Sequence, residues 1–257
     1  MKNQYFGDIR DLFKYDLVLE LLLRSSLRRF TFIPMLTEDE SNTHGRRIDY
    51  SRARAGTQRV VLRSFLERCL TSDRRNIKEL EKFFSGKKFS KKIKLKIYER
   101  NSYFLDKTRR EYFSAIDSDL LTRSVILVDP DIGLEVKSMK ERENKYVKYK
   151  EVKLLYDRMD KYSMLLVFQF IPRVIRKRYF SKISKWLKQK VVGESPVYYI
   201  SDNQVVFFIL TKDLRLQKFL EDALYSYAHS YGLIAGKCNT VTGKGVYKSY
   251  PRTGIRD

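Results

Sequence analysis

The sequence predicts an α/β protein whose sheet is mostly parallel and ends in an antiparallel hairpin. Two short apolar runs, 125–128 and 164–170, have the length and the β-branched or aromatic content of buried strands. Helical segments alternate with them, and strands that alternate with helices form parallel sheets. Further on, only four residues join the strand-like runs 197–200 and 205–210, which is typical of a hairpin.

Hydrophobic spacing predicts the elements of the first half. Leu17, Val18 and Leu21 fall on one face of a helix, and Val61 and Phe65 do the same in a later helix. The apolar run that begins at Phe30 is typical of a strand. The elements expected before residue 120 are helix 11–24, strand 30–36, helix 60–70 and helix 106–116.

The second half predicts a Rossmann-like arrangement with helices on both faces of the sheet. Helices are expected at 151–159, 174–190 and 214–231, and the second of these is amphipathic with a basic outer stripe. In a Rossmann-like methyltransferase sheet, the last strand inserts antiparallel to the others. The strand 30–36 would then be the first of the sheet, 125–128 the fourth and 164–170 the fifth.

Composition favours an anionic partner. The chain has 257 residues, is 43% hydrophobic and carries a formal net charge of +22, so it has enough apolar residues for a core but a strongly self-repelling surface. Nucleic acid, either DNA or RNA, is the simplest partner for such an excess. The two cysteines, Cys69 and Cys238, have no zinc spacing, and two histidines are too few for a histidine metal site.

One domain is expected over 1–231, with a basic helical insertion around 37–116 and a basic, glycine-rich tail over 232–257. Within and after the insertion, we expect the following cations to contact nucleic acid: Arg46, Arg47, Lys91, Lys92, Arg173, Arg176 and Arg178. The polar first residues resemble no signal peptide, and no apolar run approaches the roughly 18 residues of a membrane span. We therefore expect a cytoplasmic protein that does not enter a membrane.

The most informative segment follows the strand 125–128. Asp129-Pro130-Asp131 comes directly after it, and Glu135 follows a glycine. Open α/β sheets build their sites in the crevice outside the carboxyl ends of the strands. Carboxylates this close repel one another unless a proton, a cation or a basic side chain lies between them. Asp129 and Asp131 are therefore the centre of the predicted site.

Several segments together resemble an uncharacterised prokaryotic family. They are Tyr5-Phe-Gly-Asp8 with Asp11 and Lys14-Tyr15, then Asp129-Pro-Asp131 with Gly133-Leu-Glu135. The strand that ends in Asp-Pro is also similar, more distantly, to adenine-N6 methyltransferases and to the three-Cys-motif partner proteins. This resemblance implies that Asp129 meets a target amine and that S-adenosylmethionine binds beside it.

Three functions remain open. A nucleic-acid methyltransferase would use Asp129 with Asp8 and Lys14 nearby, and Asp11, Met35 and Thr37 would line the donor site. Position 131 is Asp where those enzymes have Pro, Ile132 replaces an aromatic residue, and the loop 35–45 lacks the usual glycines.

The second function is a magnesium-dependent nuclease or phosphotransfer enzyme, because clustered carboxylate oxygens suit Mg²⁺. Asp129, Asp131 and Glu135 would hold the ion, with Asp8 or Asp11 as a further ligand. The third is a basic nucleic-acid-binding protein without enzymatic activity, for which the charge alone would suffice.

Overall fold

A computed structural model describes residues 1–41, 47–86, 89, 92–136, 139 and 142–239 in full, and the backbone of 245–249. Its main sheet has eight strands in the order β10-β9-β7-β8-β6-β3-β1-β2. Their bounds are β1 Arg29–Ile33, β2 Lys94–Ile97, β3 Ser124–Val128, β6 Met164–Phe170, β7 Val197–Ser201, β8 Val205–Leu210, β9 Ile234–Cys238 and β10 Gly245–Ser249.

The strands β2, β1, β3 and β6 are parallel to one another, whereas β8 is antiparallel to both of its neighbours, β6 and β7. The strand β9 is antiparallel to β7, and β10 is antiparallel to β9. Six of the eight strands therefore run in the same direction. The expected α/β, Rossmann-like sheet with a C-terminal hairpin is confirmed.

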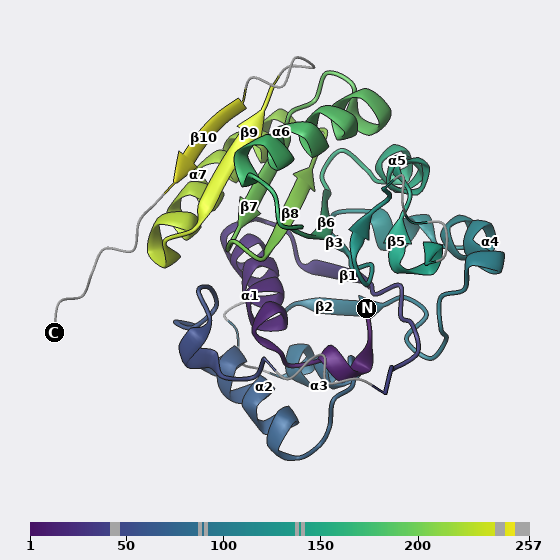
Figure 1. Cartoon of the computed structure of the whole chain (residues 1–257), viewed down its shortest axis with the longest axis vertical. Helices are drawn as coiled ribbons and strands as arrows, with labels where there is room; N and C mark the ends of the chain where they lie inside the picture. The colour runs from purple at the N-terminus through teal and green to yellow at the C-terminus, as the bar shows by residue number, and fades with distance from the viewer. Residues whose placement is uncertain are drawn as a thin grey trace, which may run out of the picture.

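The helices form a layer on each face of the sheet (Figure 1). One apolar core joins the sheet to α1 (Ile9–Arg24), α2 (Val60–Thr71), α3 (Glu79–Ser85) and α7 (Leu214–Tyr231). The other core joins it to α4 (Arg109–Ser114), α5 (Tyr149–Arg158) and α6 (Arg176–Leu187). A separate ladder pairs β4 (Gly133–Leu134) with β5 (Tyr146–Val147).

Strands buried on both faces explain why the sequence shows apolar runs without alternation. In β3, Val125 and Leu127 enter the first core, while Ile126 and Val128 enter the second. Polar side chains are also buried in the first core. Asp16 of α1 is fully buried and accepts hydrogen bonds from Arg59 and, at 2.6 Å, from the hydroxyl of Tyr227 in α7.

The structure corrects two expectations about the domain. The predicted insertion contains β2, so the segment 37–116 contributes a strand to the sheet as well as helices. The predicted tail begins with β9 and β10, which extend the sheet beyond β7. None of the helices in the described part of the chain is long and apolar enough to cross a membrane.

Several element ends also differ from the prediction. The strand 30–36 ends at Ile33, because Pro34 has no N–H for the ladder. The helix 106–116 is shorter, with a 3₁₀ turn over 106–108 before α4. The helix 174–190 begins at Arg176 and ends in a π-helical turn, Lys188–Val192, where the buried Lys188 ammonium donates 3.0 Å hydrogen bonds to the carbonyls of Glu194 and Ser195.

Candidate functional site at the carboxyl ends of β1 and β3

The adjacent strands β1 and β3 end side by side at the switch point of the sheet. The chain that leaves β1 continues into α2 and α3 on one face, whereas the chain that leaves β3 continues into α5 on the other. The backbone N–H of Asp129 donates a 2.9 Å hydrogen bond to the carbonyl of Ile33, so Asp129 lies at the ends of both strands. Ligand sites of open α/β sheets form at such a point.

A buried ion cluster lies at this point. The Nζ atom of Lys14 is 2.6 Å from Oδ1 of Asp11 and 2.6 Å from Oδ2 of Asp129, and all three side chains are at most 5% exposed. Asp11 and Lys14 are one turn apart on α1, so they face the same way. Helix α1 therefore brings a carboxylate and an ammonium group to the carboxylate at the end of β3.

Burial shifts the pKa values of these groups. Burial would lower the pKa of Lys14, but the carboxylates of Asp11 and Asp129 outweigh it and raise this pKa above its ordinary value. Burial raises the pKa of Asp129, and the ammonium of Lys14 opposes this shift. Lys14 is therefore charged at neutral pH, and it is the main compensation for two carboxylates without access to water.

Asp8 adjoins the cluster at the start of α1. It caps the helix by accepting hydrogen bonds from the backbone N–H groups of Arg10 at 2.9 Å and Asp11 at 3.0 Å. Burial, followed by the carboxylate of Asp11, raises the pKa of Asp8 to about 6, and Arg10 opposes the shift. Asp8 therefore has both a structural role and a titration near neutral pH.

The first residue of the chain lies in the same crevice, and the marked N-terminus is close to β1 (Figure 1). The amino group of Met1 donates hydrogen bonds to the carbonyls of Met35 at 3.1 Å and Asp129 at 3.2 Å. The N–H of Thr37 donates in turn to the carbonyl of Met1 at 2.8 Å. Burial lowers the pKa of the amino group to about 6, although Asp131 and Asp129 oppose the shift.

The residues that were expected to line the donor site contact other parts of the chain. Met35 and Thr37 contact Met1, and Asp11 binds Lys14 and the N–H of Gly7. These hydrogen bonds use the hydroxyl of Thr37 and both carboxylate oxygens of Asp11. The donor site therefore stays a prediction.

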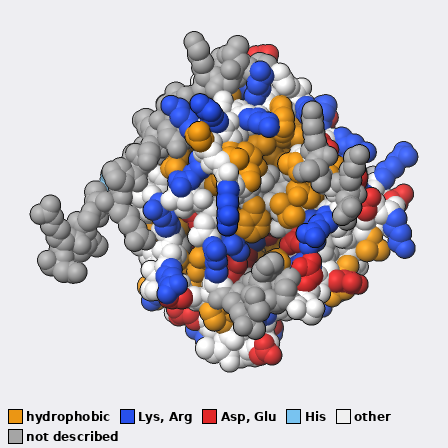
Figure 2. All heavy atoms as spheres, viewed as in Figure 1, with side chains coloured by type: hydrophobic (Ala, Val, Ile, Leu, Met, Phe, Trp, Pro, Cys, Tyr) orange, Lys and Arg blue, Asp and Glu red, His pale blue; other side chains and the backbone are white. Residues whose placement is uncertain are grey.

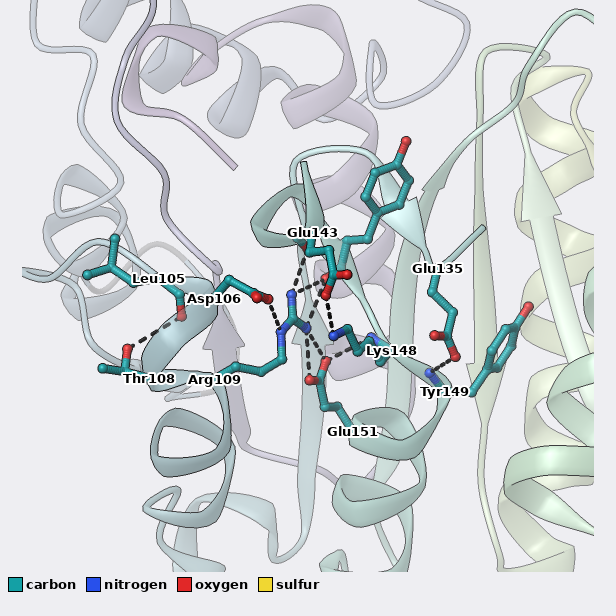
Figure 3. Close-up of polar contacts among 10 residues, drawn as sticks. Leu105, Asp106, Thr108, Arg109, Glu135, Glu143, Lys148, Tyr149 and Glu151 are labelled. Carbon is teal, nitrogen blue, oxygen red and sulfur yellow. Dashed lines mark hydrogen bonds and ion pairs between the residues drawn. The ribbon is translucent and has the colours of Figure 1, made fainter. Parts of the chain in front are cut away.

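The two other predicted acids have different surroundings. Asp131 is 7% exposed; its Oδ1 atom has no hydrogen-bond partner in the described part of the chain, and its Oδ2 atom is 3.7 Å from Nζ of Lys145. Glu135 instead accepts a 2.9 Å hydrogen bond from the N–H of Tyr149 at the start of α5 (Figure 3). Within the described ranges, no group of three or more His, Cys, Asp or Glu side chains could hold a metal ion.

The glycine of the acidic segment has a structural role. Gly133 has a φ of +146°, and a Cβ there would lie 2.3 Å from Oε1 of Gln169. That same oxygen accepts a 2.7 Å hydrogen bond from the N–H of Leu134. Gly133 and Leu134 therefore pack β4 against β6.

The predicted nucleic-acid contacts fall into separate regions. Arg46 and Lys91 lie outside the described residues, and Lys92 lies before β2, at the amino edge of the sheet. Arg47 and Arg176 lie at the carboxyl edge, where they hydrogen-bond to the side chains of Gln204 and Asn203 in the β7–β8 turn. Residues far apart in the sequence thus place positive charge at the same turn.

Two further arginines, Arg10 and Arg54, lie at this edge and were not among the predicted contacts. The carbon Cζ of Arg10 lies 4.6 Å from the ring centroid of Phe170 at the end of β6. Together with Arg54, Arg10 opposes the rise that burial imposes on the pKa of Asp202 in the same turn. The spacing of Arg10 from Asp8 and Lys14, on the first turns of one helix, was the available signal.

Helix α6 lies in a long basic stretch that contains no acid. The 33 residues 161–193 contain nine Lys or Arg and no Asp or Glu. We define the α6 basic surface as Arg173, Arg176, Arg178, Lys182 and Lys185, all of which are exposed. No ion pair with an acid of the described chain neutralises them. Figure 2 shows Lys and Arg side chains around a central group of hydrophobic side chains on the face in view.

Comparisons of the chain with protein-family models, with curated proteins and with solved structures give no match.

Proposed function

We propose that the protein binds nucleic acid through the α6 basic surface and the adjoining β7–β8 turn. The observation that carries the proposal is the group of five exposed cations of this surface, in a stretch, 161–193, that contains no acid. A polyphosphate backbone gains affinity from such a surface by releasing its condensed counterions. The hydrogen bonds of Arg47 and Arg176 to the turn extend the positive surface toward the Lys14–Asp129 cluster.

Aromatic side chains lie among these cations. Trp186 of α6 is partly buried, and Nζ of Lys182 lies 4.7 Å from its ring centroid. Aromatic rings and arginine planes stack on unpaired bases, whereas lysines contact phosphates. This combination favours nucleic acid over an anionic membrane as the partner.

The test compares two variants that lose the same charge from opposite helix layers. Arg178→Gln/Lys182→Gln changes α6, and Arg215→Gln/Lys218→Gln changes exposed positions of α7 on the other side of the sheet. Binding of labelled DNA and RNA oligonucleotides is measured by fluorescence anisotropy over a series of salt concentrations. We expect the α6 variant to reduce the slope of log K against log salt by about 2, one per lost phosphate contact.

The α7 variant should keep the slope of the unmodified protein. Equal losses in the two variants would mean that net charge, rather than α6, drives binding, and the proposal would then be wrong. A difference between DNA and RNA would identify the preferred nucleic acid.

We also propose a methyltransferase-like reaction at Asp129 as the second candidate. The observation that favours it over a nuclease is the insertion of β8 antiparallel between β6 and β7, with Asp129 at the end of β3. Calorimetry with S-adenosylmethionine tests it, with Asp129→Asn in parallel. Binding that the substitution weakens would support this function, and a donor that does not bind the unmodified protein would refute it.

A further inference from the structure

A surface cavity of about 660 Å³ lies between α4 and α5. Its lining includes the apolar side chains of Phe113 and Leu154 and the cations Lys107, Arg110 and Lys150. Cavities of roughly 300–1,000 Å³ are the size that proteins use for small molecules. It is formed by other elements than the Lys14–Asp129 cluster, so neither function proposed above accounts for it.

A buried arginine fixes one wall of this cavity (Figure 3). The Nη1 atom of Arg109 lies 2.8 and 2.7 Å from the two carboxylate oxygens of Glu151, and its Nε is 2.8 Å from Oδ1 of Asp106. Its Nη2 donates to the carbonyls of Glu143 at 2.6 Å and Tyr146 at 3.1 Å. These bonds connect α4 to α5 and to the segment before it, so a ligand would meet a wall that is already ordered.

Some charged residues that line the cavity form ion pairs, and others do not. The carboxylates of Asp106 and Glu151 bind Arg109, so they are not available to other cations. Lys107, Arg110 and Lys150 are exposed and form no ion pair with any acid of the described chain. Glu111 also lines the cavity and is the one acid among the described lining residues that does not bind Arg109, so the three cations leave an excess of positive charge beside Phe113 and Leu154.

We infer that this cavity binds a small molecule that joins a phosphate group to an apolar body, the chemistry of a nucleoside phosphate. The three cations would contact the phosphate, because ammonium and guanidinium groups form charge-assisted hydrogen bonds with its oxygens. Phe113 and Leu154 would contact the apolar part. A free phosphate would use only the first set of contacts, and an uncharged nucleoside only the second.

Calorimetry with ADP, pyrophosphate and adenosine tests this inference on the full chain. The variant Arg110→Gln/Lys150→Gln changes two exposed positions of the cavity, and Arg215→Gln/Lys218→Gln on α7 is the control of equal charge. We expect ADP to bind the unmodified protein and the control alike, and the cavity variant about tenfold more weakly. ADP should also bind more tightly than either pyrophosphate or adenosine.

Three outcomes would overturn the inference: no binding of ADP, equal loss in the control, or pyrophosphate binding as tightly as ADP. The same variants separate this inference from nucleic-acid binding. The cavity variant should retain the oligonucleotide affinity, and Arg178→Gln/Lys182→Gln should retain the ADP affinity.

Discussion

Removing the charge of Lys14 tests the buried ion cluster directly. Lys14→Met keeps a long side chain but leaves the carboxylates of Asp11 and Asp129 without their shared cation. At a separation of 2.6 Å, an effective dielectric constant of about 20 gives roughly 6 kcal/mol for each pair. The desolvation of the three groups cancels much of this gain, so we expect the free energy of unfolding to fall by about 3–5 kcal/mol.

Urea unfolding followed by circular dichroism measures this loss. The slope of the free energy of unfolding against urea concentration should be the same in both proteins. Arg24→Gln is the matched control, because the Arg24–Glu20 pair on the same helix has a distance of 3.4 Å and is more exposed, and its loss should cost less than about 1 kcal/mol. The double variant Lys14→Met/Asp129→Asn should be more stable than Lys14→Met, since one orphaned charge is gone. A loss in Lys14→Met no larger than that of the control would refute the reasoning.

Three further predictions concern pH, packing and salt. Asp8 has a pKa near 6 when folded and an ordinary value of 3.8, so the folded state binds its proton more tightly and stability falls as pH rises from about 4 to 6. Asp8→Asn should remove this fall, of about 2–3 kcal/mol, from urea titrations across that range. Gly133→Ala should lower the melting temperature more than Gly193→Ala, because an added Cβ meets Gln169 at the first site and open space at the second; equal shifts would contradict the packing argument. Raising NaCl from about 0.05 to 0.5 M should raise the melting temperature by screening the +22 charge, and a decrease would contradict the self-repulsion.

The sequence predicted the ends of strands correctly where the whole strand is buried. The strands 164–170 and 205–210 have the predicted ends because both faces are covered, which requires an uninterrupted apolar run. The strand β2 was not among the expected elements, because Lys94 and Lys96 alternate with apolar residues over only four positions. The strand β9 contains Ala235 and Gly236, which have low β-propensity, so its pairing with β7 decides its structure.

Part of the candidate site could be predicted from the sequence, and the rest could not, for physical reasons. Acids at the end of a strand and an acid–lysine pair one turn apart on a helix are visible in the sequence, and the fold joins Asp11, Lys14 and Asp129. The position of the Met1 amino group was not predictable, because no residue pattern reports where a chain terminus packs. The contact of Glu135 with the backbone N–H of Tyr149 was not predictable either, because it depends on how α5 packs after β4 and β5.

The contact between Asp16 and Tyr227 has a consequence for synthesis on the ribosome. The two residues are 211 positions apart, and Asp16 is fully buried between Arg59 and the hydroxyl of Tyr227. A nascent chain that lacks α7 would leave this carboxylate and the adjoining apolar face of α1 uncovered. Helix α1 is therefore made long before α7, but it is fully packed only after α7 has been synthesised.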